Sequence, residues 1–221
     1  MMPMRPSRTL RRRLRGQEGF TLAELMVAMM ILGIVLPVFY GVLSSVQQST
    51  VRNDFLSRAN DQARLAVEEL DREIRSGNVL YDPGTETPAN YTLRIYTQTN
   101  ATTRAPTFGN PGYVCALWTI DDEDRLIKNI WPPLKPEEAT GWRVVAEGVV
   151  NRVMDPAVPA FALDADPNRG SRTVGITLVV NPDPDNAWAR TIRIETASTG
   201  RNTSYGFPQD VCNGTPAGGT P

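Results

Sequence analysis

The chain has 221 residues, enough for one globular domain and an extension, and its formal net charge of −1 is unevenly distributed. The first 19 residues hold six of the 23 basic residues and one of the 24 acidic residues, so the remainder carries a net charge of −6. An acidic body argues against a general nucleic-acid binder, and the absence of histidine excludes His-based acid–base catalysis, Ser-His-Asp or Cys-His nucleophiles and histidine-containing metal sites.

An apolar run follows the basic segment. No residue from Leu25 to Val51 is charged, and Leu25 to Leu43 is dominated by aliphatic residues, Met, Phe and Ala. About 20 such residues suffice for a helix to cross a bilayer, and arginines on the N-terminal side place the N-terminus in the cytoplasm. The sequence therefore predicts a single-pass membrane protein whose residues after about 45 are extracytoplasmic.

Three other interpretations of this region are weaker. A cleaved signal peptide has a shorter apolar region followed by a small-residue site, for which Leu43-Ser44-Ser45 is a poor candidate. The pair Arg11-Arg12 suggests a twin-arginine signal, but the apolar run is too long and is interrupted by Glu24. A basic nucleic-acid tail does not explain why the segment adjoins an apolar run.

Glu24 is the only charged residue between Phe20 and Val51. One explanation is local: Thr21 and Glu24 fit the capping-box pattern, and a carboxylate in the first turn suits the helix dipole. A second explanation involves cleavage between Gly19 and Phe20. The new α-amine of Phe20 then lies about 6 Å along the axis from Glu24 and supplies the positive partner that a carboxylate at membrane depth requires.

The basic leader, Gly19 and the run FTLAELMVAMMILGIVLPVFYGVL resemble the N-terminal signal of type IV pilins and type II secretion pseudopilins. The resemblance implies that prepilin peptidase cuts after Gly19 and methylates the amine of Phe20, and that Glu24 pairs with a neighbouring subunit's amine during assembly. The leader is longer than the shortest in the family, and Pro37 lies somewhat nearer the cut than the proline of major pilins.

The apolar stripe continues at helical spacing beyond the membrane segment, through Phe55, Leu70 and Ile74 among others. Ser76-Gly77-Asn78 is a helix stop, so the pattern predicts one helix from about Phe20 to Arg75. Gly33 and Pro37 weaken its membrane half. The sequence leaves open whether they form a functional hinge or an ordinary transmembrane kink.

From Asn78 onward the apolar periodicity changes to two, which indicates strands. Proline- and glycine-rich stretches separate them, and Asp121-Asp122-Glu123-Asp124 reads as a hairpin turn. The resulting class is α+β, with an antiparallel sheet packed on the outer half of the helix. The expected strands cover residues 91–97, 113–120, 125–131, 142–150, 173–180 and 190–196.

Cys115 and Cys212 suggest one disulfide if the head is exported, and buried thiols if it is cytosolic. A bond would close a loop of about 97 residues and contribute about 4–5 kcal/mol in the chain-entropy model. Asp164, Asp166 and Asn168 have the spacing of a calcium loop, but the following glycine is one place late and the final glutamate is missing. They are weak metal candidates, and no cofactor is expected.

Later segments, such as RSGNVLYDP and TVGITLVV, resemble J-type minor pseudopilins and W-type minor pilins. The resemblance implies a non-enzymatic minor subunit that helps initiate or cap a type IV pilus or type II secretion pseudopilus. The implied partners are prepilin peptidase, other major and minor pilins or pseudopilins, and the inner-membrane assembly platform, with no nucleic acid.

The alternative is a membrane-tethered binding pilin, used in adhesion or DNA uptake, whose head contacts an external ligand. The expected organisation is a cleaved leader, a transmembrane half-helix, an extracytoplasmic half-helix, a β-rich head and a flexible tail, covering residues 1–19, 20–44, 45–77, 78–213 and 214–221.

Overall fold

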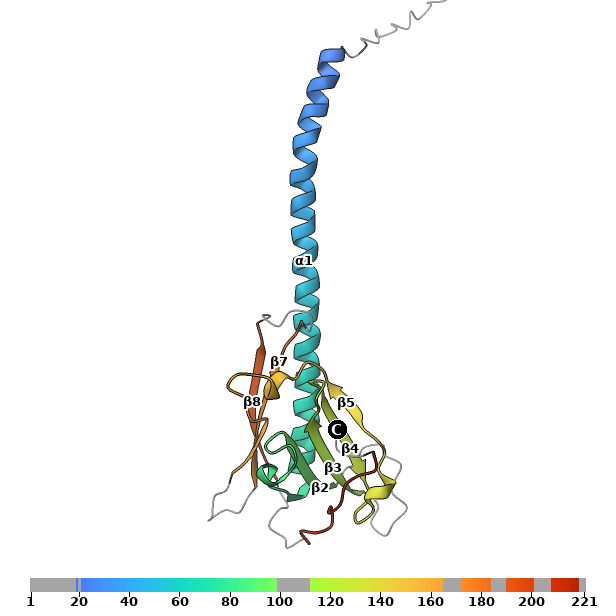
Figure 1. Ribbon diagram of the computed structural model, residues 1–221, viewed down its shortest axis with the longest axis vertical. Coiled ribbons are helices and arrows are strands. Elements are labelled where there is room, and N and C mark those ends of the chain that lie inside the picture. Colours follow the sequence, from blue (N-terminus) through green and yellow to red (C-terminus); the bar gives the residue numbers. More distant parts are fainter. Residues whose placement is uncertain are drawn as a thin grey trace, which may run out of the picture. The chain divides into compact units, whose positions relative to one another are not determined.

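The computed structural model describes residue 19 and residues 21–98, 112–164, 172–183, 190–200 and 208–218. The chain divides into two units, with the boundary between Thr50 and Val51, and each is described by itself. Helix α1 (Leu22–Arg75) supplies the helical residues of both units (Figure 1).

In the first unit, α1 is continuous through Gly33 and Pro37, which lie inside the assigned helix. Its apolar side chains are exposed along the whole segment: Met26 is 64 % exposed and Phe39 is 63 % exposed. The helix is long and apolar enough to cross a membrane. An apolar surface of this size requires lipid or neighbouring helices to cover it.

In the second unit, α1 buries one stripe and leaves the opposite side exposed. Ala63, Ala66, Leu70 and Ile74 are fully buried, which agrees with the predicted helical spacing. The helix ends at Arg75, where expected. The hydroxyl of Ser76 donates to the carbonyl of Arg72 at 2.9 Å, which supplies a partner to one of the last carbonyls of the helix. Strand β1 follows at once.

The β-rich head contains two antiparallel sheets, whereas the sequence predicted one. The five-stranded sheet follows chain order: β1 (Gly77–Leu80), β2 (Thr92–Gln98), β3 (Tyr113–Ile120), β4 (Leu126–Trp131) and β5 (Arg143–Ala146). The three-stranded sheet contains β6 (Phe161–Leu163), β7 (Thr173–Val180) and β8 (Ile192–Thr199). An isolated antiparallel bridge pairs Val149, after β5, with Val180 of β7. Single 3₁₀ turns cover Pro83–Thr85 (η1), Pro136–Glu138 (η2) and Val150–Arg152 (η3).

Most strand predictions are confirmed, with two corrections. The strand expected at residues 142–150 ends at Ala146, because Gly148 adopts a φ of 68° and η3 follows. Strands β1 and β6 were not predicted; each is short and has no clear alternation. The predicted hairpin joins β3 to β4, and Asp124 in its turn adopts a φ of 57°.

One continuous core joins α1 to both sheets. Trp118 and Ile120 of β3 contribute to it from the five-stranded sheet, and Ile176 and Leu178 of β7 contribute from the three-stranded sheet. Alternate residues of β3 point to the other face, where Cys115 and Leu117 form a second cluster. Figure 1 shows β7 and β8 on one side of α1 and β2 to β5 on the other.

The C-terminal segment covers that second cluster. The backbone N–H of Leu134 donates to the carbonyl of Val211, and the N–H of Ala217 donates to the carbonyl of Pro136, both at 2.9 Å. Pro216 is buried. These contacts reach Ala217, within the segment 214–221 that the sequence predicts to be flexible, and that flexibility stays a prediction.

Candidate functional site

The N-terminus of α1 has the geometry of a capping box. Thr21 precedes the first helical residue, and both its backbone N–H and its hydroxyl donate to Oε2 of Glu24 at 2.9 Å. The backbone N–H of Glu24 lies 3.3 Å from the Thr21 hydroxyl oxygen, which accepts from it. The local interpretation of Glu24 therefore describes real contacts of the isolated chain.

The same contacts leave part of Glu24 available. All the hydrogen bonds to its carboxylate among the described residues involve Oε2, so Oε1 has no partner there. Glu24 is exposed. A carboxylate accepts from several donors at once, so one oxygen serves the cap while the other can accept from an external cation. Phe20, the predicted source of that cation, lies outside the described residues, whereas Gly19 is described and exposed.

The helix surface beside Glu24 is shaped for close approach. A shallow depression there is lined by Ala23, Val27, Ala28 and Ile31. Small residues on a membrane helix allow a neighbouring helix to come near, and van der Waals packing then contributes to association. The first turns of α1 thus combine one carboxylate with a small apolar face.

Gly33 lies farther along the same exposed helix. An added Cβ at Gly33 would meet no atom of the described chain within 4 Å, and the same holds for Gly41. No contact within the described residues therefore requires either glycine. The predicted hinge or kink at Gly33 and Pro37 remains a prediction, since α1 is assigned without a break there.

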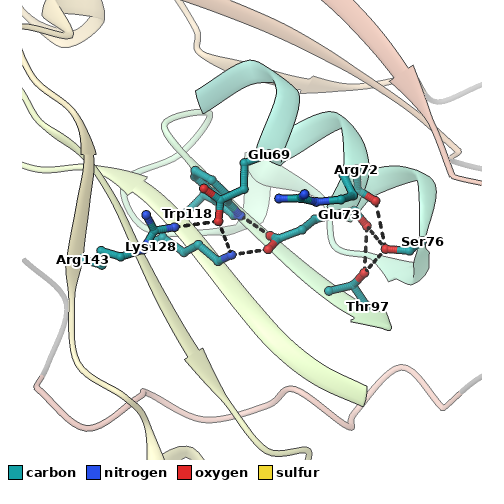
Figure 2. Close-up of polar contacts among 8 residues, drawn as sticks. All are labelled: Glu69, Arg72, Glu73, Ser76, Thr97, Trp118, Lys128 and Arg143. Atoms are coloured by element: carbon teal, nitrogen blue, oxygen red, sulfur yellow. Dashed lines mark hydrogen bonds and ion pairs between the residues drawn. The ribbon is translucent and has the colours of Figure 1, made fainter. Parts of the chain in front are cut away.

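A buried charged cluster in the head was not predicted (Figure 2). Lys128 of β4 forms ion pairs with Glu73 and with Glu69 of α1, the latter at 2.9 Å. Trp118 donates from Nε1 to Oε2 of Glu73 at 2.7 Å, and Arg143 of β5 donates to Oε1 of Glu69 at 2.6 Å. The Lys128 ammonium also lies 5.0 Å from the centre of the Trp118 ring.

Burial determines how this cluster behaves. Glu73 is 5 % exposed, and burial raises its pKa above the ordinary value against the opposing charge of Lys128. Glu69 is less buried; desolvation opposes its ionisation, but hydrogen bonds from Arg143 and Lys128 lower its pKa overall. Because both carboxylates are occupied by protein donors, the cluster ties α1 to the sheet rather than presenting a pair of catalytic acids.

Two sequence signals could have indicated it. Lys128 is the single charged residue in the strand LIKNIW, and it faces the helix between Leu126 and Ile130. Glu73 falls on the buried stripe of α1 beside Ile74. An isolated charge at an apolar position of a strand, together with an opposite charge at an apolar position of a helix, predicts a buried pair.

The remaining predicted site residues have different outcomes. Cys115 and Cys212 form a disulfide with Cα atoms 5.5 Å apart. Asp164 is exposed and its backbone N–H donates to the carbonyl of Thr173 at 2.7 Å, while Asp166 and Asn168 lie outside the described residues. Within the described ranges, no three His, Cys, Asp or Glu side chains are grouped to hold a metal ion.

The structure is that of an α+β protein whose long apolar helix begins with a capping box. Residues 14–36 match the family described as the prokaryotic N-terminal methylation motif, so the chain carries a type IV pilin-like prepilin signal. The match ends within α1 and does not extend into the head. Comparisons with curated proteins and with solved structures gave no match. The signal is of the kind that type IV pilin-like proteins carry, and the helix that follows it is long and apolar enough to cross a membrane.

Proposed function

We propose that the chain is a minor subunit of a type IV pilus or type II secretion pseudopilus, processed by prepilin peptidase and incorporated through Glu24. The observation that carries the proposal is the methylation motif at residues 14–36, which ends inside an exposed apolar helix. Cleavage after Gly19 removes six arginines and creates an amine at Phe20. That amine is the positive partner that the free oxygen of Glu24 lacks.

Electrostatics explains why this arrangement favours polymers. A carboxylate within the bilayer costs up to about 3 kcal/mol if it is unpaired near the centre. The cap formed by Thr21 satisfies hydrogen bonds but supplies no positive charge. A neighbouring subunit's amine supplies both a hydrogen-bond donor and a positive charge. The membrane therefore favours association of processed subunits. The exposed apolar residues from Leu22 to Val46 give the neighbours a surface to pack against.

The head supports a role as a partner-facing domain in an assembly. It has two sheets, a disulfide and an internal charged cluster, which together favour a rigid body. In this proposal α1 is the polymerising rod, other pilins and the inner-membrane assembly platform are the partners, and the head is extracytoplasmic. The minor role rests on the loose resemblance of the head sequence to minor subunits. The neighbouring genes distinguish secretion from pilus systems.

Mass spectrometry of the membrane-extracted protein tests the proposal. The expected N-terminus is methylated Phe20, present only in cells that contain prepilin peptidase. A matched variant, Gly19→Val, blocks the cut by placing a branched side chain at the scissile bond, and it should retain the leader. An intact N-terminus at Met1 or Met2, or a cut beyond Ser44, contradicts the proposal.

A further inference from the structure

The C-terminal segment, residues 208–218, covers one face of the five-stranded sheet, and we call it the cover. The strand register pairs Trp131 of β4 with Cys115 of β3, and Asn129 lies on the same face two residues before Trp131. Each of these three side chains is at most 1 % exposed. The cover reaches this face through Cys212, which is bonded to Cys115, and through a carbonyl oxygen that accepts from Nδ2 of Asn129 at 3.4 Å.

The cover buries little of its own surface. Within it, Cys212 and Pro216 are buried and Val211 is half-buried, whereas the other residues are exposed. Segments with few buried apolar contacts and an exposed backbone open locally at a lower free energy than the rest of a fold. The disulfide and a small number of hydrogen bonds therefore hold the cover in place.

Two side chains of the sheet hold the backbone of Cys212. The backbone N–H of Cys212 donates to the hydroxyl oxygen of Tyr81, which directly follows β1, at 3.2 Å. Arg94 of β2 donates from Nη1 to the carbonyl oxygen of Cys212 at 2.9 Å, and its Nη2 donates to Glu86 at 2.8 Å. Both polar groups of the Cys212 backbone are thus fixed, with its Cα atom 5.5 Å from that of Cys115.

The closed cover lies over polar atoms that lack partners. Nε1 of Trp131, Oδ1 of Asn129 and Nε of Arg94 are buried and have no hydrogen-bond partner among the described residues. The register places Arg94 and Asn129 on either side of Leu117, on the covered face. A buried donor or acceptor without a partner costs free energy, and so does the ordering of the cover's backbone. Both costs oppose closure, and the disulfide offsets them.

We propose that the cover is redox-dependent: it is closed while Cys115 and Cys212 are bonded, and it opens without unfolding of the rest of the head when they are reduced. Tyr81 and Arg94 are positioning residues that bring Cys212 to Cys115 for closure. An open cover exposes the sheet face that contains Trp131, so that face is protected only where thiols are oxidised, as outside the cytoplasm. The cover lies wholly in the head unit and does not depend on processing of the N-terminus.

Opening and closing each consist of two thiol–disulfide exchanges. In opening, a thiolate of a dithiol reductant attacks one sulfur of the bond, forms a mixed disulfide and displaces the other cysteine, which takes up a proton. The second thiol of the reductant then loses its proton and displaces the remaining cysteine, so the reductant becomes a disulfide and both cysteines become thiols. In closing, a disulfide oxidant accepts the two electrons and leaves as two thiols. Because Cys115 and Cys212 are both fully buried, the reductant reaches the bond only through transient openings of the cover.

Hydrogen exchange of the full detergent-solubilised chain, with and without dithiothreitol, tests the proposal, and alkylation confirms that both cysteines are reduced. Reduction should speed exchange of the amides in residues 208–218 by about tenfold or more, while the amides of β7 stay protected. Equal protection of residues 208–218 in the two states overturns the proposal, because the cover then stays closed without the bond. Simultaneous loss of protection in β7 also overturns it, because the whole head then unfolds.

Tyr81→Phe tests the positioning of Cys212, because it removes the hydroxyl that accepts from the Cys212 backbone and keeps the ring. Dithiothreitol should reduce the bond in this variant about three- to tenfold faster than in wild type, and the equilibrium with glutathione should shift toward the thiols. Tyr113→Phe is the matched control, since the Tyr113 hydroxyl forms no hydrogen bond with any described residue, and it should change neither value. If Tyr81→Phe behaves like Tyr113→Phe, the positioning role is overturned.

Discussion

Trp118 of β3 donates a hydrogen bond of 2.7 Å from its indole Nε1 to Oε2 of Glu73 of α1, and both side chains are buried. The other carboxylate oxygen of Glu73 pairs with Lys128 (Figure 2). Trp118 therefore orients the acid while Lys128 compensates its charge. This relationship fixes the last turns of α1 against the five-stranded sheet, and the stability of the head should depend on it.

Removing the positive charge of Lys128 should lower the stability of the head. Lys128→Met leaves Glu73 buried without a positive partner, and loss of one member of a buried pair typically costs about 3–5 kcal/mol. Adding Glu73→Gln should recover part of the loss, because the amide still accepts from Trp118 without requiring a counter-charge. Denaturant unfolding of the detergent-solubilised protein, followed by tryptophan fluorescence, measures both.

A surface pair gives the matched control for that substitution. Arg193 pairs with Glu195 on β8 at 2.5 Å, with both side chains more than half exposed. Arg193→Met should cost less than about 1 kcal/mol, as exposed pairs do. If Lys128→Met is no more destabilising than Arg193→Met, the buried cluster does not hold the helix to the sheet.

Glu69 should make the head sensitive to acid. Burial opposes its ionisation, but hydrogen bonds from Arg143 and Lys128 outweigh this effect and place its pKa below the ordinary 4.5. A lowered pKa in the folded state stabilises the fold above the unfolded-state pKa, and that stabilisation is lost as pH falls through the folded pKa. Wild type should therefore exceed Glu69→Gln in stability at pH 7, and the difference should shrink below about pH 4.5.

Glu73 should show the opposite dependence. Burial raises the pKa of Glu73 in the folded state. The contribution of Glu73 to the stability of the fold is therefore fully present below its unfolded-state pKa of about 4.5, and it is lost as pH rises through the folded-state pKa. The stability of wild type relative to Glu73→Gln should fall as pH rises from the unfolded-state pKa of Glu73 through its folded-state pKa. Unfolding curves of both variants across pH measure the two slopes, and slopes of equal sign contradict this account.

The disulfide should stabilise the head and its C-terminal segment. The bond between Cys115 and Cys212 closes a loop of 97 residues, and its removal should cost about 4–5 kcal/mol in the chain-entropy model. The variant Cys115→Ala/Cys212→Ala should also expose the backbone of residues 208–218, which hydrogen exchange detects. Chemical reduction of wild type is the control and should reproduce both effects. Unchanged protection of residues 208–218 would show that their backbone contacts suffice without the bond.

Two substitutions separate the capping role of Glu24 from its proposed role in assembly. Glu24→Gln retains a hydrogen-bonding side chain but removes the charge, so we expect processing at Gly19 to continue and incorporation into filaments to fall about tenfold or more. Thr21→Val removes the hydroxyl contacts and costs about 0.5–2 kcal/mol of helix stability while the charge remains. Immunoblots of sheared filaments measure both; an equal loss in the two variants assigns Glu24 to capping alone.

Local patterns predicted much of the fold. The apolar run indicated the exposed half of α1, the helical stripe through Leu70 and Ile74 indicated its buried face, and alternation indicated β2, β3, β4 and β7. Such patterns succeed because side-chain burial repeats with the period of the element itself. Strands β1 and β6 escaped prediction, since four and three residues are too few to show a period.

The candidate site residues also fall into two groups, those that a local sequence pattern indicates and those that only the fold brings together. Gly19, Phe20 and Glu24 could be proposed from sequence because the methylation motif and the capping box are both defined by residues that lie close together along the chain. The isolated charges of Glu73 and Lys128 on apolar faces indicate that each needs a partner, but the sequence does not pair them with each other, because Lys128 lies 55 residues farther along the chain. Nothing in the spacing of the two residues specifies that α1 and β4 face each other.

By itself the sequence determined that this protein has a prepilin-type signal, one long amphipathic and apolar helix, and a β-rich head, because these properties depend on neighbours along the chain. The tertiary structure decided the division into two sheets, the buried pairing of Glu73 with Lys128 and the closure of the Cys115–Cys212 bond. Each of these joins residues distant in sequence, and their distances are set by the packing of the whole head.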